Sequence, residues 1–162
     1  MSHISRYPVA ALDSLPADIK SRVLAVQEKA GFVPNIFLAM AHRPDELRAF
    51  MDYHDALMIK DSGLTQAERE MIIVATSSDN GCLYCVVAHG AVLRIRAKDA
   101  LVADQVAINH LKADISARQK AMLTFALKIS NNAQATSDED FTMLKGHGFS
   151  EDDTWDIAAI TA

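Results

Sequence analysis

Glycine and proline are scarce in this chain, with 6 glycines and 4 prolines among 162 residues. A β-sandwich or barrel turns about every ten residues and needs more of both. Aromatic residues make up only 6% of the chain, whereas half of all residues are hydrophobic. Because alanine, leucine, isoleucine, methionine, lysine and glutamate are common, we expect helices around a sizeable core rather than a disordered chain.

Basic residues are a minority, since 16 Lys and Arg stand against 21 Asp and Glu, for a net charge of −5. No block of Lys or Arg occurs, so nothing favours nucleic acid or an anionic membrane surface as a partner. No apolar run approaches the ~20 residues that span a bilayer. Residues 1–16 lack the apolar segment of a signal peptide. We therefore expect a cytoplasmic protein that binds neither nucleic acid nor membrane.

Cysteine occurs only twice, as Cys82 and Cys85 in the stretch GCLYCVVAHG, and His89 follows four residues after the second. A stable structural disulfide is not expected in a reducing compartment. Two cysteines at this spacing indicate catalysis or metal binding instead. A metal clamp, a redox dithiol and coincidence are the three interpretations to separate.

Cap and break signals divide the chain into helices. We expect helices over residues 16–30, 35–42, 44–60, 65–78, 82–96, 98–110 and 116–131, one from 138 to a stop at 146–148, and one from 151. No strand-like alternation and no internal repeat is present. The sequence predicts one all-α domain over residues 1–162. Because the last helix reaches Ala162 without a stop signal, we expect the natural chain to continue past that residue.

The three reactive side chains share one face of the helix expected over residues 82–96. At about 100° per residue, Cys85 lies roughly 60° from Cys82, and His89 falls between them. Unpaired N–H groups and the positive end of the dipole in the first turn favour a thiolate. A C-x-x-C at a helix start suits a disulfide that closes and reopens. His89, one turn from Cys85, is placed to take or hold its proton.

Glu70 lies in the middle of a mostly apolar stripe on the preceding helix, formed by Ala67, Ile73, Val74 and Ser77. A buried glutamate is unfavourable unless it is paired or protonated, and such a group suits proton transfer. Glu68 and Arg69 point away from this stripe and receive no role in the site, although Thr65 and Glu68 fit a capping box at the start of the helix. Because the turn between the two helices is short, an antiparallel pair would bring Glu70 towards Cys85 and His89. A buried acid that only caps or bridges helices is the alternative.

The pattern of Glu70, eleven residues, Cys82-Leu83-Tyr84-Cys85, three residues and His89 closely resembles the core motif of the alkylhydroperoxidase D and carboxymuconolactone decarboxylase superfamily. The resemblance is closest to the peroxidase-related branch of this superfamily. It extends beyond the motif to the segments GFVPN (31–35), YHDALM (53–58) and TQAERE (65–70). It implies an all-α multihelical fold and assembly into homotrimers or homohexamers. It also implies thiol-based peroxide reduction that needs no prosthetic cofactor and no metal.

The resemblance assigns a role to each residue of the motif. Cys85 resembles the peroxidatic cysteine, which becomes a sulfenic acid, and Cys82 resembles the partner that closes the disulfide. Glu70 and His89 resemble the proton relay. Tyr84 stands where alkylhydroperoxidase D usually has a second histidine, so the detailed relay and the lipoyl-type reductant do not transfer directly. We expect hydrogen peroxide or an organic hydroperoxide as substrate and an external dithiol or a thioredoxin-like protein as reductant.

Other interpretations stay open. Cys82 and Cys85 can be two small buried hydrophobic residues. With His89 and Glu70 they offer four zinc ligands, although this spacing on one helix is unusual for a structural zinc site. A helical redox-sensing or metal-binding module without turnover is a further reading. The superfamily also hosts decarboxylases of small acids, a reaction that does not need a redox dithiol.

Tyr84 and His54 are candidates for a supporting role beside the site. Tyr84 points to another face of its helix, and we expect an aromatic contact rather than a catalytic acid. His54 lies among Leu47, Phe50, Met51, Leu57 and Met58. We interpret it as a buried core histidine in preference to a supporting role.

Overall fold

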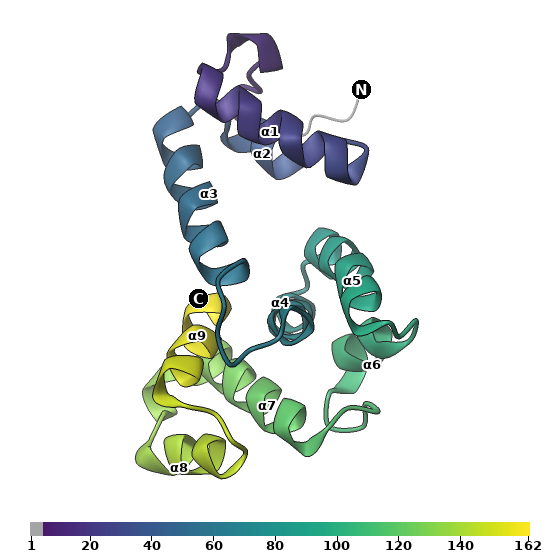
Figure 1. Ribbon diagram of the computed structural model, residues 1–162, viewed down its shortest axis with the longest axis vertical. Helices are drawn as coiled ribbons and strands as arrows, with labels where there is room; N and C mark the ends of the chain where they lie inside the picture. The colour runs from purple at the N-terminus through teal and green to yellow at the C-terminus, as the bar shows by residue number, and fades with distance from the viewer. Residues whose placement is uncertain (1–4) are drawn as a thin grey trace. The chain divides into compact units, whose positions relative to one another are not determined.

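The structure is a computed structural model that describes residues 5–162. In that part the chain forms nine α-helices and no β-strand (Figure 1), which confirms the predicted all-α fold. The helices are α1 (Ala17–Ala30), α2 (Asn35–Met40), α3 (Pro44–Met58), α4 (Gln66–Asp79), α5 (Leu83–Ala97), α6 (Val102–Asn109), α7 (Ala117–Asn132), α8 (Asp138–Gly146) and α9 (Glu151–Thr161). None of these helices combines the length and apolarity needed to cross a membrane.

The chain divides into two compact units, residues 1–56 and 57–162, and the single domain expected from the sequence stays a prediction. In the first unit, α1, α2 and most of α3 enclose a small apolar cluster of Leu15, Ile19, Val23, Ala41, Leu47 and Met51. Arg22 of α1 pairs with Asp52 and Asp55 of α3 at the surface of this unit.

His54 is exposed on α3, so the expectation of a buried core histidine is wrong. Its Nδ1 lies 3.1 Å from Asp55 Oδ1, and its ring lies beside the exposed ring of Phe50. The physical reason is that α3 buries a narrower stripe than its apolar residues suggest. Leu47, Met51 and Met58 are buried, whereas the residues flanking them are not.

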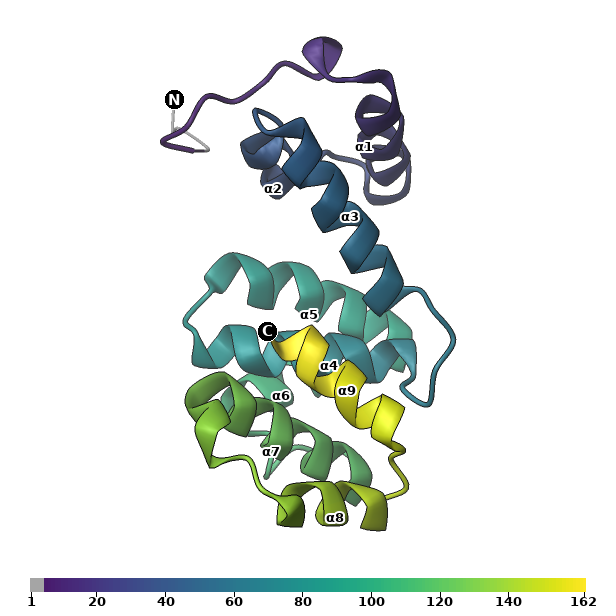
Figure 2. The ribbon, with the colours of Figure 1, turned by 90° about the vertical axis from the view of Figure 1, so that its left-hand side faces the viewer.

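Helix α4 lies at the centre of the second unit, and α5, α6, α7 and α9 all pack against it (Figure 1). Figure 2 shows α5 running alongside α4. Nine residues of α4 are buried: Glu68, Arg69, Glu70, Met71, Ile72, Val74, Ala75, Thr76 and Ser77. A helix enclosed in this way has no broad solvent face, so its polar residues must find partners inside the protein.

Arg69 illustrates this requirement, because it points away from the apolar stripe and is nevertheless only 1% exposed. It donates to three oxygens of the segment before α4: Met58 O at 3.0 Å, Lys60 O at 2.6 Å and Ser62 Oγ at 2.8 Å. Glu68 is buried too, and pairs with Arg118 of α7. Arg69 thus has a structural role that the sequence pattern does not indicate, and Glu68 has one in addition to its place at the start of α4.

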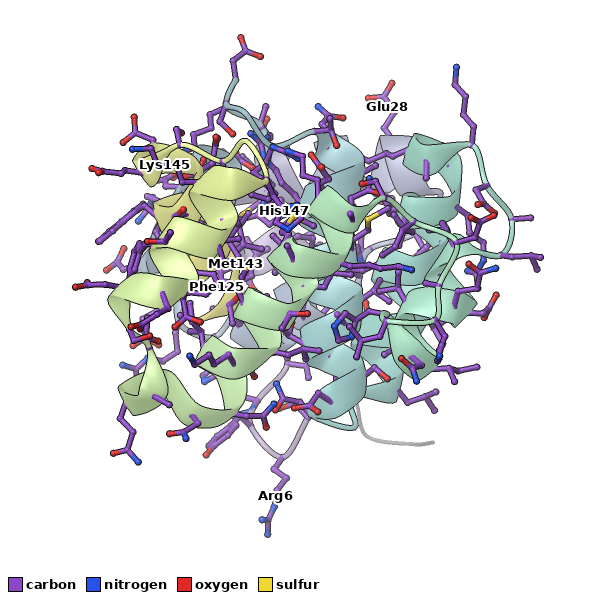
Figure 3. All side chains as sticks on the ribbon, turned by 90° about the horizontal axis from the view of Figure 1, so that it is seen from below. Arg6, Glu28, Phe125, Met143, Lys145 and His147 are labelled. Carbon is purple, nitrogen blue, oxygen red and sulfur yellow. A yellow bond between two sulfur atoms is a disulfide. The ribbon has the colours of Figure 1, made fainter. Side chains whose placement is uncertain are left out.

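The core of the second unit is built around the apolar side of α4. Its fully buried members include Ile72, Val74, Leu93, Met122, Leu123, Leu144 and Ile157. Phe125 of α7 belongs to this cluster, and Met143 of α8 packs against it (Figure 3). The Phe125 ring also meets the ring of Phe141 edge to face. This continuous core fixes α4, and hence the residues that α4 carries.

Capping residues fix where the helices begin. Thr65 and Glu68 form a capping box at the start of α4, and equivalent boxes open α7 at Ser116 and α9 at Ser150. Helix α6 begins four residues later than expected. Lys98 adopts a left-handed conformation after α5, and Asp99 Oδ1 then accepts hydrogen bonds from the amides of residues 101 and 102.

Candidate active site

The turn from α4 into α5 positions the two cysteines. Gly81 has a φ of 65°, a left-handed conformation that favours glycine. Its amide donates to Ser78 O, and the next amide, of Cys82, donates to Ser77 O. This is a Schellman closure of α4. Cys82 therefore leaves one helix and opens the next, and α5 returns alongside α4.

Cys82 and Cys85 are joined by a disulfide, with their Cα atoms 5.4 Å apart. Cys82 is the N-cap of α5, and its Sγ accepts a hydrogen bond of 3.3 Å from the amide of Cys85. Both residues are partly buried. The sulfurs thus lie at the positive end of α5, next to amides that have no partner within the helix, and this surrounding stabilises a thiolate when the bond is reduced.

His89 and Glu70 are in contact, as their places on the two helices predict. His89 Nδ1 lies 2.8 Å from Glu70 Oε2. The Glu70 side chain is 5% exposed and that of His89 33% exposed. Because a carboxylate can only accept, Nδ1 carries the hydrogen and Nε2 is left as the basic nitrogen of the ring. His89 follows Cys85 by one helical turn, so the imidazole and this cysteine share a face of α5.

Arg96 is a member of the site that the sequence reading missed. Its Nη1 lies 3.1 Å from Glu70 Oε1, so both oxygens of the carboxylate are bound from α5. His89 and Arg96 are seven residues apart, which is two helical turns and the same face. This spacing is the signal that could have identified Arg96. The buried glutamate thus has a partner on each oxygen, one of the two situations expected for it.

Tyr84 and His54 are the two residues for which a supporting role was expected. Tyr84 is 47% exposed, on a different face of α5 from His89. His54 belongs to the first unit, and its supporting role stays a prediction. Within residues 5–162, no three or more His, Cys, Asp or Glu side chains are arranged to hold a metal ion. In this structure the two sulfurs bind each other instead.

Comparisons with known proteins identify relatives of this chain. The sequence profile of the Carboxymuconolactone decarboxylase family matches residues 44–107. A crystal structure from Ralstonia eutropha JMP134, named an alkylhydroperoxidase AhpD core and an uncharacterized peroxidase-related protein, is 64% identical, with a TM-score of 0.96 over 99% of this chain and 85% of that one. An uncharacterized peroxidase-related protein from Silicibacter sp. TM1040 is 38% identical, with a TM-score of 0.90 over 98% of this chain and 82% of that one.

None of the curated proteins matches the chain. The two solved structures cover nearly all of it at identities that establish common descent, and both carry the peroxidase-related name. The profile match includes the whole motif from Glu70 to His89. The chain belongs to the alkylhydroperoxidase D and carboxymuconolactone decarboxylase superfamily, in its peroxidase-related branch.

Proposed function

We propose that this protein is a thiol-dependent peroxidase that reduces hydrogen peroxide or organic hydroperoxides with the dithiol of Cys82 and Cys85. The observation that carries the proposal is the disulfide at the start of α5 with the His89 and Glu70 pair one turn further along. A redox pair of sulfurs and a proton relay are the two parts that thiol-based peroxide reduction requires.

The first step begins from the reduced dithiol. His89 Nε2 takes the proton of the Cys85 thiol, and the thiolate attacks the nearer peroxide oxygen. The O–O bond breaks, Cys85 becomes a sulfenic acid, and the leaving alkoxide or hydroxide takes the relay proton to depart as alcohol or water. Glu70 holds the imidazole ring in the orientation that this transfer needs.

The second step closes the disulfide that the structure contains. The Cys82 thiol attacks the Cys85 sulfenic sulfur, and water leaves. An external dithiol or a thioredoxin-like protein then reduces the disulfide by thiol exchange and is itself oxidised. Each cycle converts one hydroperoxide and one external dithiol into an alcohol, a water and an external disulfide. No prosthetic group enters this balance, and a reducing cytoplasm supplies the external dithiol.

We further propose that the chain works as a homotrimer or homohexamer. Helix α5 leaves Leu83, Val87 and Ile95 exposed, and Ile108 and Leu111 are exposed on and after α6. Large apolar side chains left exposed on two neighbouring helices are typical of surfaces that another subunit covers. Light scattering at micromolar concentration should give a mass of three or six chains, and a monomeric mass would refute the assembly.

The experiment that tests the function is peroxide consumption with a panel of reductants: dithiothreitol, a lipoyl dithiol and a thioredoxin system. Turnover that requires both cysteines supports a peroxidase. A protein whose thiols oxidise without turnover would be a redox sensor. Loss of carbon dioxide from a small acid, unaffected when Cys82 and Cys85 are replaced, would identify a decarboxylase instead.

A further inference from the structure

The Glu70 carboxylate is buried between two groups of α5, of which only one has a permanent charge. Arg96 is always cationic, whereas His89 is neutral or cationic according to its surroundings. The side chain of Arg96 is 30% exposed. It reaches from the edge of α5 to Glu70 Oε1, and its Nη1 also lies 3.4 Å from Gln66 O near the start of α4. Arg96 thus spans both helices at the point where the carboxylate is enclosed.

Several other charged or titratable groups on the helices around Glu70 have partners of their own. These pairs are Glu68 with Arg118, Arg94 with Asp104, Asp156 with Lys60, Asp153 with Ser150, Asp140 with Lys128 and His110 with Thr124. Arg69 binds backbone and hydroxyl oxygens. Among the side chains of the second unit, Arg96 is the one permanent cation within 4.0 Å of Glu70.

We propose that Arg96 is a positioning residue that supplies the charge needed to keep Glu70 ionised and His89 neutral at the same time. The net charge of the three side chains is then zero, with one arginine cation, one carboxylate and one neutral imidazole. Because the Arg96 cation balances the charge of the Glu70 carboxylate, the imidazole does not need a second proton. Its Nδ1–H stays on Glu70, and Nε2 stays free to accept the proton of the Cys85 thiol.

Without Arg96, the same buried pair would carry an uncompensated negative charge. Burial disfavours such a charge strongly, so the pair of Glu70 and His89 takes up one proton. The proton ends on His89, which can then no longer act as a base, or on Glu70, whose carboxyl then donates to Nδ1 and leaves the ring hydrogen on Nε2. In either case the site loses the proton acceptor that thiol activation requires.

This role deepens the proposed peroxidase function and rests on it for its purpose, but its test needs no peroxide. The measurement is NMR at pH 7 of the reduced protein, with the His89 ring nitrogens observed by ¹⁵N and the Glu70 carboxyl carbon by ¹³C. The wild type should show a neutral imidazole with hydrogen on Nδ1 and an ionised carboxylate. Arg96→Met should show one added proton on His89 or on Glu70.

Two further variants separate charge from structure. Arg96→Lys keeps the charge and should retain the wild-type signals, whereas Arg96→Gln keeps a hydrogen-bond donor without charge and should behave like Arg96→Met. Arg94→Met is the matched control, because Arg94 lies on the same helix but pairs with Asp104 of α6. It should leave both signals unchanged. Should Arg96→Met fail to fold, Arg96→Gln carries the test with the same expected result.

Thiol reactivity gives the second readout. The alkylation rate of Cys85 by iodoacetamide at pH 7 should fall by about 10-fold in Arg96→Gln and stay near wild type in Arg96→Lys and Arg94→Met. If Arg96→Gln shows the added proton while the wild-type protein shows no peroxidase activity, the role of Arg96 stands and the peroxidase function is rejected. Wild-type NMR signals on both His89 and Glu70 in the folded Arg96→Gln variant would overturn the role of Arg96.

Discussion

His89 Nδ1 lies 2.8 Å from Oε2 of Glu70, a carboxylate buried in the central helix of the second unit. The contact joins a partly exposed imidazole next to the disulfide to an acid that is enclosed by protein. It determines which ring nitrogen carries the hydrogen and which one can accept a proton. The chemistry proposed for the two sulfurs depends on this pair.

The first prediction concerns that pair. His89→Gln should lower the rate of peroxide reduction by about 10² to 10³, because a positioned proton acceptor contributes on this scale. Glu70→Gln should lower this rate by about 10², because the neutral amide replaces the carboxylate that accepts the hydrogen bond from His89 Nδ1 and orients the ring. Stopped-flow measurement of peroxide consumption checks both. Glu139→Gln, in the first turn of α8, is the control and should retain full activity. A His89→Gln variant with the wild-type rate would remove His89 from the mechanism.

The second prediction separates the two cysteines. Cys82→Ser should form a sulfenic acid with peroxide, which dimedone traps, but should not turn over because nothing closes the disulfide. Cys85→Ser should give neither. The reason is that Cys85 lies one turn from the His89 base, and a directly placed base outweighs the helix dipole that also favours Cys82. Mass spectrometry of the trapped adduct decides the matter, and a dimedone adduct on Cys82 would exchange the two roles.

The third prediction concerns stability. Arg69→Met should lower the free energy of unfolding by about 3 kcal/mol, because it leaves the carbonyls of Met58 and Lys60 without the donors that now satisfy them. Urea denaturation followed by circular dichroism measures this. Arg94→Met, which loses exposed contacts with Asp104 and with the Ala100 carbonyl, should lower it by less than about 1 kcal/mol. Equal losses in the two variants would show that Arg69 has no special structural role.

The fourth prediction concerns acid. Burial by itself would raise the pKa of the Asp153 carboxyl. Hydrogen bonds from the Ser150 backbone and hydroxyl, together with the Gly63 amide and the charge of Arg118, outweigh burial and hold the pKa below its ordinary value of 3.8. The unfolded chain therefore takes up this proton first on acidification. The stability that Asp153 gives the start of α9 is fully present above about pH 4 and is lost as the pH falls through the lowered pKa of the folded state.

Thermal unfolding of wild type and Asp153→Asn at several pH values tests this directly. The variant should be less stable at pH 7, and the difference should shrink below about pH 4 as the wild-type carboxyl becomes protonated. A difference that stays constant from pH 7 to pH 2 would mean that the charge of Asp153 plays no part in capping α9.

Helix starts are predictable from the sequence where the capping partners are local. Thr65 with Glu68 and Ser150 with Asp153 mark their helices because both partners lie within four residues. The start of α6 is harder to predict, since a left-handed Lys98 and the side chain of Asp99 delay it. A hydrophobic pattern alone does not predict this irregular backbone conformation between the two helices.

The site is only partly predictable for a related reason. The contact of Glu70 with His89 follows from the short turn between two helices and the position of each residue on its wheel. Arg96 is absent from such a reading, because a basic residue in the last turn of a helix is sufficiently explained by the helix dipole. Arg69 is missed because a helical wheel assumes a solvent-facing side, and α4 is enclosed by α5, α6, α7 and α9 (Figure 1).

The most direct test of the peroxidase function is a single turnover without any reductant. The protein is reduced, freed of excess dithiol and mixed with one equivalent of hydroperoxide, and the remaining peroxide and free thiols are counted. The proposed chemistry predicts one peroxide consumed for each pair of thiols lost, with Cys82 and Cys85 joined in the product. Peroxide that persists beside two intact thiols would contradict it.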